Sequence, residues 1–163
     1  MLYCTRKDIH VDRCASAWLI RRFIDAEAAF VFVHEGDPPA SGAVPFDMHG
    51  VAWGHHGNHC TFETIVALHH LDAGDPALQQ VARIIHGADI TADADETLES
   101  AGIDLVFRGL RLVSASDDEA LERGYVVMDA LYAAVKAELT GDAEENHQRG
   151  PTDPPLEERN PSS

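Results

Sequence analysis

The sequence predicts an α/β fold with a small, mostly parallel sheet and flanking helices, followed by a helical C-terminal half and a disordered tail. Short apolar segments alternate with helical patterns in the first half of the chain, and helical patterns alone follow. An acidic stretch rich in proline closes the sequence. Strands that alternate with helices are typical of parallel sheets, because each parallel pair needs a crossover connection.

The first half of the chain supplies the expected sheet. Short apolar segments are the strand candidates, at 2–5, 28–33 and 44–48. The segment 28–33 is a continuous apolar run, which indicates a buried strand. Apolar residues recur at helical spacing over 11–24. A loop rich in glycine and histidine over 50–60 leads into a helical pattern over 61–71.

The second half is predicted to be helical. Asp75 and Pro76 form a typical helix start, with a side-chain acceptor at the N-cap and proline in the first turn. Residues 97–113 predict a helix that is bent or broken near Gly102 and Gly109.

Ser116 and Glu119 have capping-box spacing and open the clearest helix of the chain. Its apolar stripe consists of Leu121, Tyr125, Met128, Leu131, Tyr132, Val135 and Leu139. This stripe and the apolar face of the helix that follows Asp75 predict a buried helix pair, 75–86 against 117–139. We expect Leu131 to lie in that core.

Composition sets the class of protein. The 163 residues carry a net charge of −16 and are 45% hydrophobic, which suits one domain with a sizeable core. Residues 141–163 hold six acidic residues, two basic residues and four of the eight prolines, so we expect a disordered tail after a domain of residues 1–140. No apolar segment is long enough to span a membrane. The acidic balance argues against nucleic-acid binding by this chain alone.

The cysteines indicate the compartment. Cys4, Cys14 and Cys60 are odd in number and lack framework spacing, so we expect free thiols in a reducing cytoplasm. We expect Cys4 and Cys14 to be buried in the core. Cys60, beside His59, is interpreted either as a thiolate or as a small buried residue at a helix start.

Several short segments concentrate residue types that bind metals. His10 and Asp12 precede or open a helix, Asp47 ends a strand, and His55 and His56 lie between two glycines. Further candidates follow later in the sequence: His59, Cys60, Glu63, His86 and Asp89. Because parallel strands end at the same edge of a sheet, we expect these segments to converge there. Mixed nitrogen and oxygen ligands suit Zn, Mn or Fe.

Each segment also has a purely structural interpretation. Asp12 fits the first turn of a helix, Asp47 fits an ordinary turn, and histidine runs occur on surfaces. The metal hypothesis therefore depends on the coincidence of the segments, not on any one of them.

The N-terminal corner is basic although the chain is acidic. Residues 1–22 hold five basic and two acidic residues. Arg6, Lys7 and Arg13 lie near a predicted helix N-terminus, where charge and backbone N–H groups can bind a tetrahedral dianion.

The assembled segments resemble a known family, the C-terminal domain of chromate-resistance (ChrB-type) proteins. The matching stretches are HVDRCASAWLIRRFIDAEAAF (10–30), VPFDMHGVAWGHHGNHCTFE (44–63), DPALQQVARIIHGAD (75–89) and DDEALERGYVVMDALYAAV (117–135). The resemblance covers about residues 3–137. It implies a role in chromate resistance. In this family the domain often follows a DNA-binding region, to which no stretch of this chain corresponds, so we expect no nucleic-acid partner through this chain alone.

The order of motifs also resembles that of DHH-type metal-dependent phosphoesterases, which hold Mn²⁺ at the edge of a parallel sheet. By position, the resemblance implies that the metal ligands are His10, Asp12, Asp47, His55 and Asp89. It places His56 toward the substrate, as the catalytic group. Gly54 stands where that pattern has Asp, which favours one ion over two.

Three functions follow from these observations. The first is a cytoplasmic domain that binds a metal, an oxyanion such as chromate, or both, in chromate resistance or the response to chromate. The second is a metal-dependent phosphoester hydrolase. The third is a structural module without a site. We expect the partner to be a small anion such as chromate or a phosphoester, and we expect no membrane association. The sequence leaves open whether the chain forms a homodimer.

Overall fold

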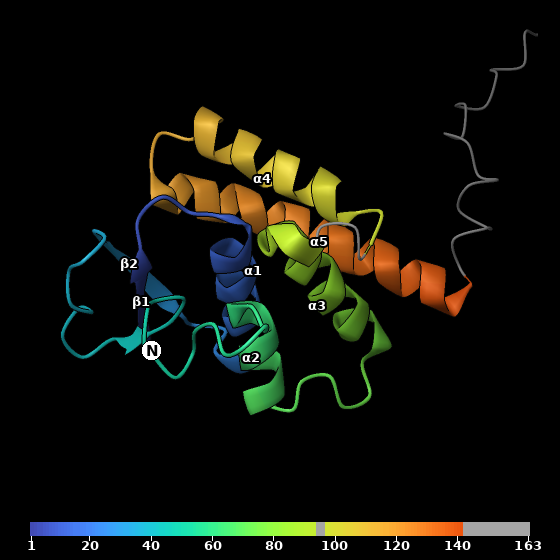
Figure 1. Cartoon of the computed structure of the whole chain (residues 1–163), viewed down its shortest axis with the longest axis horizontal. Helices are drawn as coiled ribbons and strands as arrows, with labels where there is room; N and C mark the ends of the chain where they lie inside the picture. Colours follow the sequence, from blue (N-terminus) through green and yellow to red (C-terminus); the bar gives the residue numbers. More distant parts are fainter. Residues whose placement is uncertain (94–96, 142–163) are drawn as a thin grey trace, which may run out of the picture.

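The protein has a small parallel sheet at one end and helices over the rest of the molecule (Figure 1). The computed structural model describes residues 1–93 and 97–141. The described strands are β1 (Leu2–Arg6), β2 (Ala29–Val33) and β3 (Val44–Pro45), in the order β2-β1-β3. Leu2 is in register with Ala29, and Tyr3 with Val44, in parallel pairs. The predicted α/β class with a small parallel sheet is confirmed.

Central strand β1 is the most buried strand. Tyr3, Cys4 and Thr5 are buried, while Arg6 at its carboxyl end is partly exposed. The chain leaves β1 through a turn in which Asp8 has a φ of 64°, a left-handed conformation that a short polar side chain tolerates. This turn delivers His10 to the start of the next helix.

Strands β2 and β3 depart from the sequence prediction. The apolar run of β2 was expected to be buried, but its residues are half-buried or exposed because β2 is an edge strand that pairs with β1 alone. Strand β3 has only two residues; the next residue, Phe46, still donates its N–H to the Cys4 carbonyl oxygen of β1 at 2.9 Å and also bridges to Trp53. That bridge orders the loop after β3.

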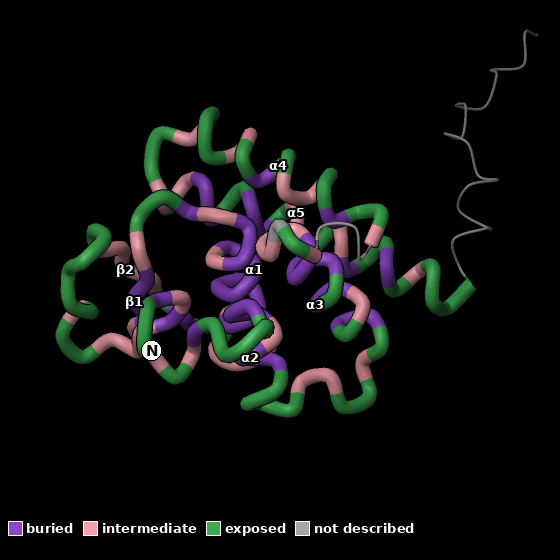
Figure 2. Tube along the Cα trace, in the orientation of Figure 1, coloured by how far each residue is buried: buried purple, intermediate pink, exposed green. Residues whose placement is uncertain are grey.

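Helix α1 (Val11–Leu19) is the centre of the molecule. All of its residues except Arg13 are buried, and it contacts α2, α3, α4 and α5. Figure 2 shows this helix as a buried column surrounded by the other elements. The helix predicted over 11–24 continues after Leu19 as a π-helical segment, η1 (Ile20–Ile24). The predicted helix is therefore continuous, but its hydrogen-bond pattern changes from α to π at Ile20.

Helices α2 (Thr61–Leu68) and α3 (Pro76–Asp89) lie beside α1. Helix α2 is shorter than the predicted span. The predicted start of α3 is confirmed, because the Asp75 side chain accepts a hydrogen bond of 2.9 Å from the Leu78 N–H. A short 3₁₀ segment, η2 (Thr91–Asp93), follows α3.

Helices α4 (Ser100–Val113) and α5 (Asp117–Thr140) run antiparallel, side by side (Figure 1). The predicted break in α4 is wrong. Gly102 and Gly109 lie within one continuous helix, where a glycine costs only about 1 kcal/mol relative to alanine. Ser116 caps α5 as predicted by accepting from the Glu119 N–H at 3.2 Å.

Helix α5 ends at Thr140 and is followed by Gly141, whose φ of 79° is a left-handed conformation favoured by glycine. The predicted tail begins at this residue, and its remainder, 142–163, lies outside the described residues. Among the described helices, none combines the length and the apolar character required to cross a membrane.

Most of the predicted stripe on α5 is core. Leu121, Tyr125, Met128, Tyr132 and Val135 are buried. The prediction is wrong for the last residue of the stripe, because Leu139 is 56% exposed near the end of α5, which projects beyond α3 (Figure 1). Leu131, expected in the core, is half-buried and packs against it. The predicted packing of α3 against α5 is present.

Met128 and Val126 offer a matched test of this packing on one helix. Met128 is fully buried, so Met128→Ala should lower the free energy of unfolding by about 2–5 kcal/mol. Val126 is 70% exposed, and Val126→Ala should change it by no more than about 0.5 kcal/mol. Urea denaturation measures both. Equal losses in the two variants would contradict the assigned face of α5.

Candidate metal and anion site

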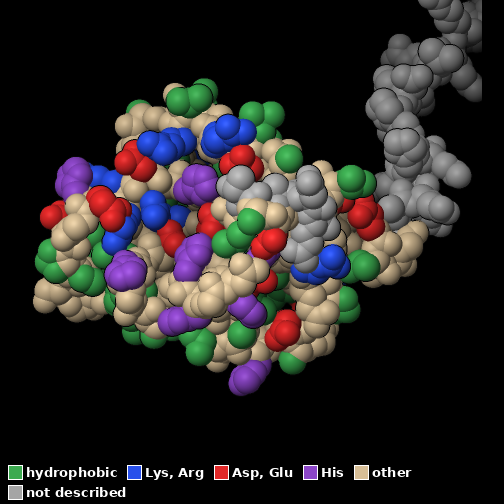
Figure 3. All heavy atoms as spheres, viewed as in Figure 1, with side chains coloured by type: hydrophobic (Ala, Val, Ile, Leu, Met, Phe, Trp, Pro, Cys, Tyr) green, Lys and Arg blue, Asp and Glu red, His purple; other side chains and the backbone are tan. Residues whose placement is uncertain are grey.

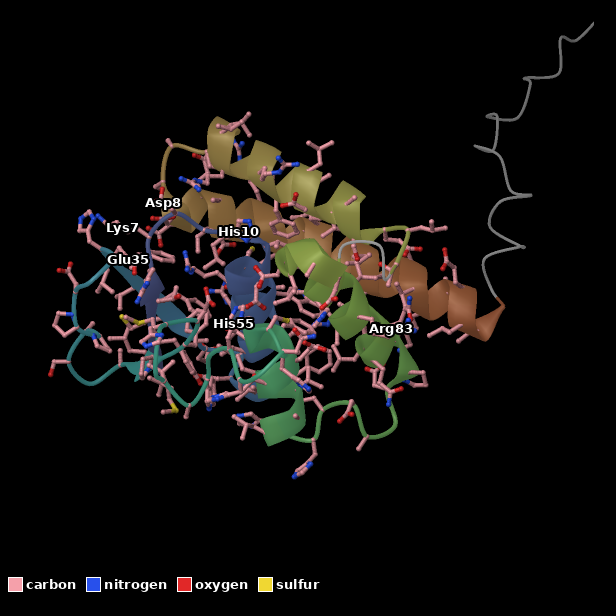
Figure 4. All side chains as sticks on the ribbon, viewed as in Figure 1. Lys7, Asp8, His10, Glu35, His55 and Arg83 are labelled. Atoms are coloured by element: carbon pink, nitrogen blue, oxygen red, sulfur yellow. The ribbon has the colours of Figure 1, made fainter. Side chains whose placement is uncertain are left out.

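The carboxyl ends of β1 and β3 deliver the first residues of the candidate site. The turn after β1 leads to His10 and α1, and Asp47 follows β3. The loop between β3 and α2 adds His55, and the end of α3 adds Asp89. On the face shown in Figure 3, histidine side chains lie among acidic and basic side chains over this region. In Figure 4, His10 and His55 lie near the middle of the molecule.

Asp12 is the most buried charged group of the site, with 2% exposure. It is in the first turn of α1, yet it caps α2. Its Oδ2 accepts from the Thr61 N–H at 2.8 Å, and its Oδ1 accepts from the Phe62 N–H at 2.9 Å. Burial acts to raise the pKa of Asp12, but hydrogen bonds from His55 and the two backbone N–H groups outweigh burial and lower it.

Asp47 faces Asp12 across the site and is held by two donors. Arg13 Nε donates to Asp47 Oδ2 at 2.7 Å, and Thr61 Oγ1 donates to Asp47 Oδ1 at 2.9 Å. The backbone of Asp47 has a φ of 48°. Burial, and next the charge of Asp12, raise the pKa of Asp47 to about 6. An added positive charge would therefore relieve this pair of carboxylates.

His55 completes a compact group with the two aspartates. Its Nε2 lies 3.2 Å from Asp12 Oδ2 and 3.7 Å from Asp47 Oδ1. One ligand atom from each of these three residues lies within 4.8 Å of the others. The hydrogen bond with Asp12, against a smaller opposing effect of burial, raises the pKa of His55 to about 9. The carboxylates around this ring nitrogen therefore favour a positive charge there, whether from a proton or from a metal ion.

Asp89 and His10 flank this group. Asp89 Oδ2 lies 3.4 Å from His55 Nε2, and Asp89 Oδ1 lies 3.4 Å from His10 Nδ1. The other ring nitrogen of His10 lies 3.9 Å from Asp104 Oδ1. The hydrogen bond with Asp89 raises the pKa of His10. One carboxylate thus joins both imidazoles, so all five predicted ligands lie in one continuous cluster, of which three form its compact centre.

Two of the three predicted anion-binding residues adjoin this cluster. Arg6 and Arg13 line a cleft of about 270 Å³ together with Asp47, Met48, His49, Gly50 and His55. Arg6 pairs with Glu35 through Nη1, while its buried Nε has no hydrogen-bond partner among the described residues. Arg13 Nη1 donates to the Lys7 and Asp8 carbonyl oxygens at 2.9 and 3.1 Å, which fixes the guanidinium in place.

Lys7 and His56 are directed elsewhere. Lys7 Nζ lies 3.1 Å from His34 Nε2, and Figure 4 shows Lys7 with Glu35 at the outer edge of the molecule. His56 Nε2 lies 3.0 Å from the Ala52 carbonyl oxygen, and His56 does not line the cleft. Adjacent side chains diverge, so the loop that directs His55 inward directs His56 outward.

Some contributors were missed by the sequence analysis. Thr61 was treated only as part of a helix, but its N–H binds Asp12 and its hydroxyl binds Asp47. Asp104 had no signal, because it lies in a helix that packs against the site from the far half of the chain. Cys60, Glu63 and His86, by contrast, were among the further candidates of the sequence analysis, and the structure places them in a separate group at the start of α2 and the end of α3.

Comparison with known proteins identifies the family. The family model described as ChrB, C-terminal domain, matches residues 3–135, which include every candidate site residue. The chain belongs to this family. The resemblance to ChrB-type C-terminal domains noted in the sequence is therefore confirmed. Protein ChrB of Cupriavidus metallidurans is 35% identical over 130 residues, which make up 80% of this chain and 39% of that protein. The chain thus spans about two fifths of this relative. No solved structure matches.

Asp12 should be a principal determinant of stability. Asp12→Ala leaves two buried N–H groups of α2 without their acceptor, which should lower the free energy of unfolding by about 1–3 kcal/mol. Glu138→Ala removes an exposed carboxylate and should change it by less than about 0.5 kcal/mol. Urea denaturation of chelator-treated protein compares them. Equal stability of the Asp12 variant and wild type would show that α2 does not depend on this cap.

The stability of the chelator-treated protein should fall as pH rises. A pKa of His55 raised from 6.5 to about 9 stabilises the fold below pH 6.5 and loses that contribution as pH rises through about 9. The melting temperature should therefore decline over this range in wild type. The melting temperature of His55→Gln should decline less steeply with pH, and that of His56→Gln should decline as in wild type. If the melting temperature of His55→Gln fell as steeply as that of wild type, the decline would come from groups other than His55.

Proposed function

We propose that this chain is a cytoplasmic, metal-dependent oxyanion-binding domain that acts in chromate resistance or in the response to chromate. The observation that carries the proposal is the compact group of Asp12, Asp47 and His55, with ligand atoms within 4.8 Å, beside a cleft lined by two arginines. Membership of the ChrB C-terminal domain family supports the chromate context. The three free cysteines suit a reducing compartment.

The donor set suits a divalent transition metal. Two carboxylates and one imidazole are ligands of Mn, Zn and Fe in proteins. Asp89 and His10 lie next to this centre and can complete the coordination. One ion is proposed here, because the two aspartates and His55 form a single compact group. Arg13 and Thr61 hold Asp47 from outside, as the partners that orient metal ligands commonly do.

A metal ion would also offset the electrostatic repulsion that the carboxylates of the site exert on an anion. Asp12, Asp47 and Asp89 surround His55, and three carboxylates would repel a dianion at short range. A divalent cation at this point reverses the local charge. We therefore propose that the metal binds first and that the oxyanion binds only to the metal-loaded protein.

Arg6 and Arg13 would hold the anion from the other wall of the cleft. A guanidinium offers several N–H donors to a tetrahedral oxyanion such as chromate. Arg6 has a buried Nε without a hydrogen-bond partner among the described residues, which is the type of donor that a ligand can satisfy. Lys7 lies outside the residues that line the cleft, so it should contribute less than Arg6.

Calorimetric titration tests the order of binding. Molybdate serves as a tetrahedral dianion that does not oxidise the thiols, and chelator-treated protein is compared with protein loaded with Mn²⁺ or Zn²⁺. Molybdate should bind the loaded protein and not the chelated one. Arg6→Gln should weaken this binding by about tenfold, the equivalent of losing roughly 1.4 kcal/mol of charge-assisted hydrogen bonding, without loss of metal. Lys7→Gln should leave it unchanged.

Neighbouring histidines provide the control for the metal. In Mn²⁺-loaded protein, His55→Ala should abolish bound Mn²⁺, measured by elemental analysis, and molybdate binding with it. His56→Ala should retain the Mn²⁺. Equal Mn²⁺ content in wild type and His55→Ala would overturn the proposal. Turnover of a generic phosphodiester by the Mn²⁺-loaded protein, lost in His56→Ala, would instead favour the phosphoester hydrolase.

A further inference from the structure

A second group of metal-binding residue types lies at the junction of α2 and α3. Cys60 is the N-cap of α2, Glu63 is one turn further on, and His86 is in the last turn of α3. A sulfur, a carboxylate oxygen and a ring nitrogen from these residues lie within 4.8 Å of one another. Cys60 is fully buried and His86 is 7% exposed. None of the three lines the cleft described above.

His86 is placed between two carboxylates. Its Nδ1 lies 2.6 Å from Glu63 Oε2, and its Nε2 lies 3.0 Å from Asp93 Oδ2. A neutral imidazole has only one N–H, so it can donate to just one of two ionised carboxylates. The other ring nitrogen would then direct its lone pair at an oxygen that also carries lone pairs. A positive charge at this junction removes the conflict.

The combination of donors indicates which cation fits. A thiolate, an imidazole and a carboxylate form a softer set than the two aspartates and histidine of the first group. Zinc binds Cys, His and carboxylate ligands in tetrahedral sites. Asp93 contacts His86 Nε2, the ring nitrogen that does not face Glu63, so it would orient the imidazole from outside the ion site rather than bind the ion.

From this placement we infer that Cys60, Glu63 and His86 form a second cation site, selective for Zn²⁺ and separate from the site at Asp12, Asp47 and His55. The two sites share no ligand residue. They meet at the first turn of α2, where the N–H groups of Thr61 and Phe62 bind Asp12 and the N–H of Cys60 binds Glu63 at 3.0 Å. A zinc ion here would tie α2 to α3 and stabilise the turn on which the first site depends.

Cobalt is the probe for this site, because a Co²⁺–thiolate bond gives a near-ultraviolet charge-transfer band that carboxylate and imidazole ligands do not give. Chelator-treated wild type should develop the band on titration with Co²⁺, and Zn²⁺ should displace it, as the order of affinities requires. His55→Ala should retain the band, which separates this result from failure of the proposed function. Cys60→Ser should lose it.

The variants are chosen to keep α2 folded. Serine is a preferred N-cap residue, and Glu63→Gln keeps a capping-box residue at its position while it removes the charge. Glu63→Gln should weaken Co²⁺ binding by about 10–100-fold, whereas Cys4→Ser, which alters a buried thiol outside the group, should have no effect. No band in wild type at saturating Co²⁺, an undiminished band in Cys60→Ser, or an unchanged Co²⁺ affinity in Glu63→Gln would overturn the inference.

Discussion

The carboxylate of Asp12 is the contact on which the rest of the structure depends. It belongs to the first turn of α1 but serves as the acceptor for the first two N–H groups of α2, across 49 and 50 residues of chain. Without this acceptor, the N-terminus of α2 would be buried with its donors unpaired. One of these oxygens, Oδ2, also lies 3.2 Å from His55 Nε2, so one buried charge both joins two helices and forms part of the candidate site.

Charge balance explains why the remaining groups gather around Asp12. A second carboxylate, the half-buried Asp47, is tolerated because Arg13 and Thr61 donate hydrogen bonds to it. Burial and the charge of Asp12 nevertheless raise its pKa to about 6. His55 brings a positive charge to the point where the carboxylates converge. A proton on His55 offsets part of the repulsion between the carboxylates, and the divalent ion proposed above would take its place. This exchange links metal binding, pH and stability in one equilibrium.

The first turn of α2 connects the two proposed cation sites. Thr61 contributes to the group around Asp12, while Cys60 and Glu63 face His86 on α3. Helix α1 is buried at the centre, and the elements around it bring these residues together (Figure 2). A change in one site can therefore reach the other through a single helical turn. The arginine-lined cleft is lined by Asp47 and His55 of the first site and by none of the ligand residues proposed for the second.

The sequence alone determined the local elements, because helix caps and apolar periods are interactions over a few residues. The caps of α3 at Asp75 and α5 at Ser116 and the parallel strands were predictable, as was the set of polar segments near the strand ends. Only the tertiary structure decided that His55 faces Asp12 while His56 binds Ala52, and that Arg6 lines the cleft while Lys7 does not. It also decided the edge position of β2 and the meeting of Cys60 with His86. These outcomes depend on contacts between residues far apart in the chain, which no local period encodes.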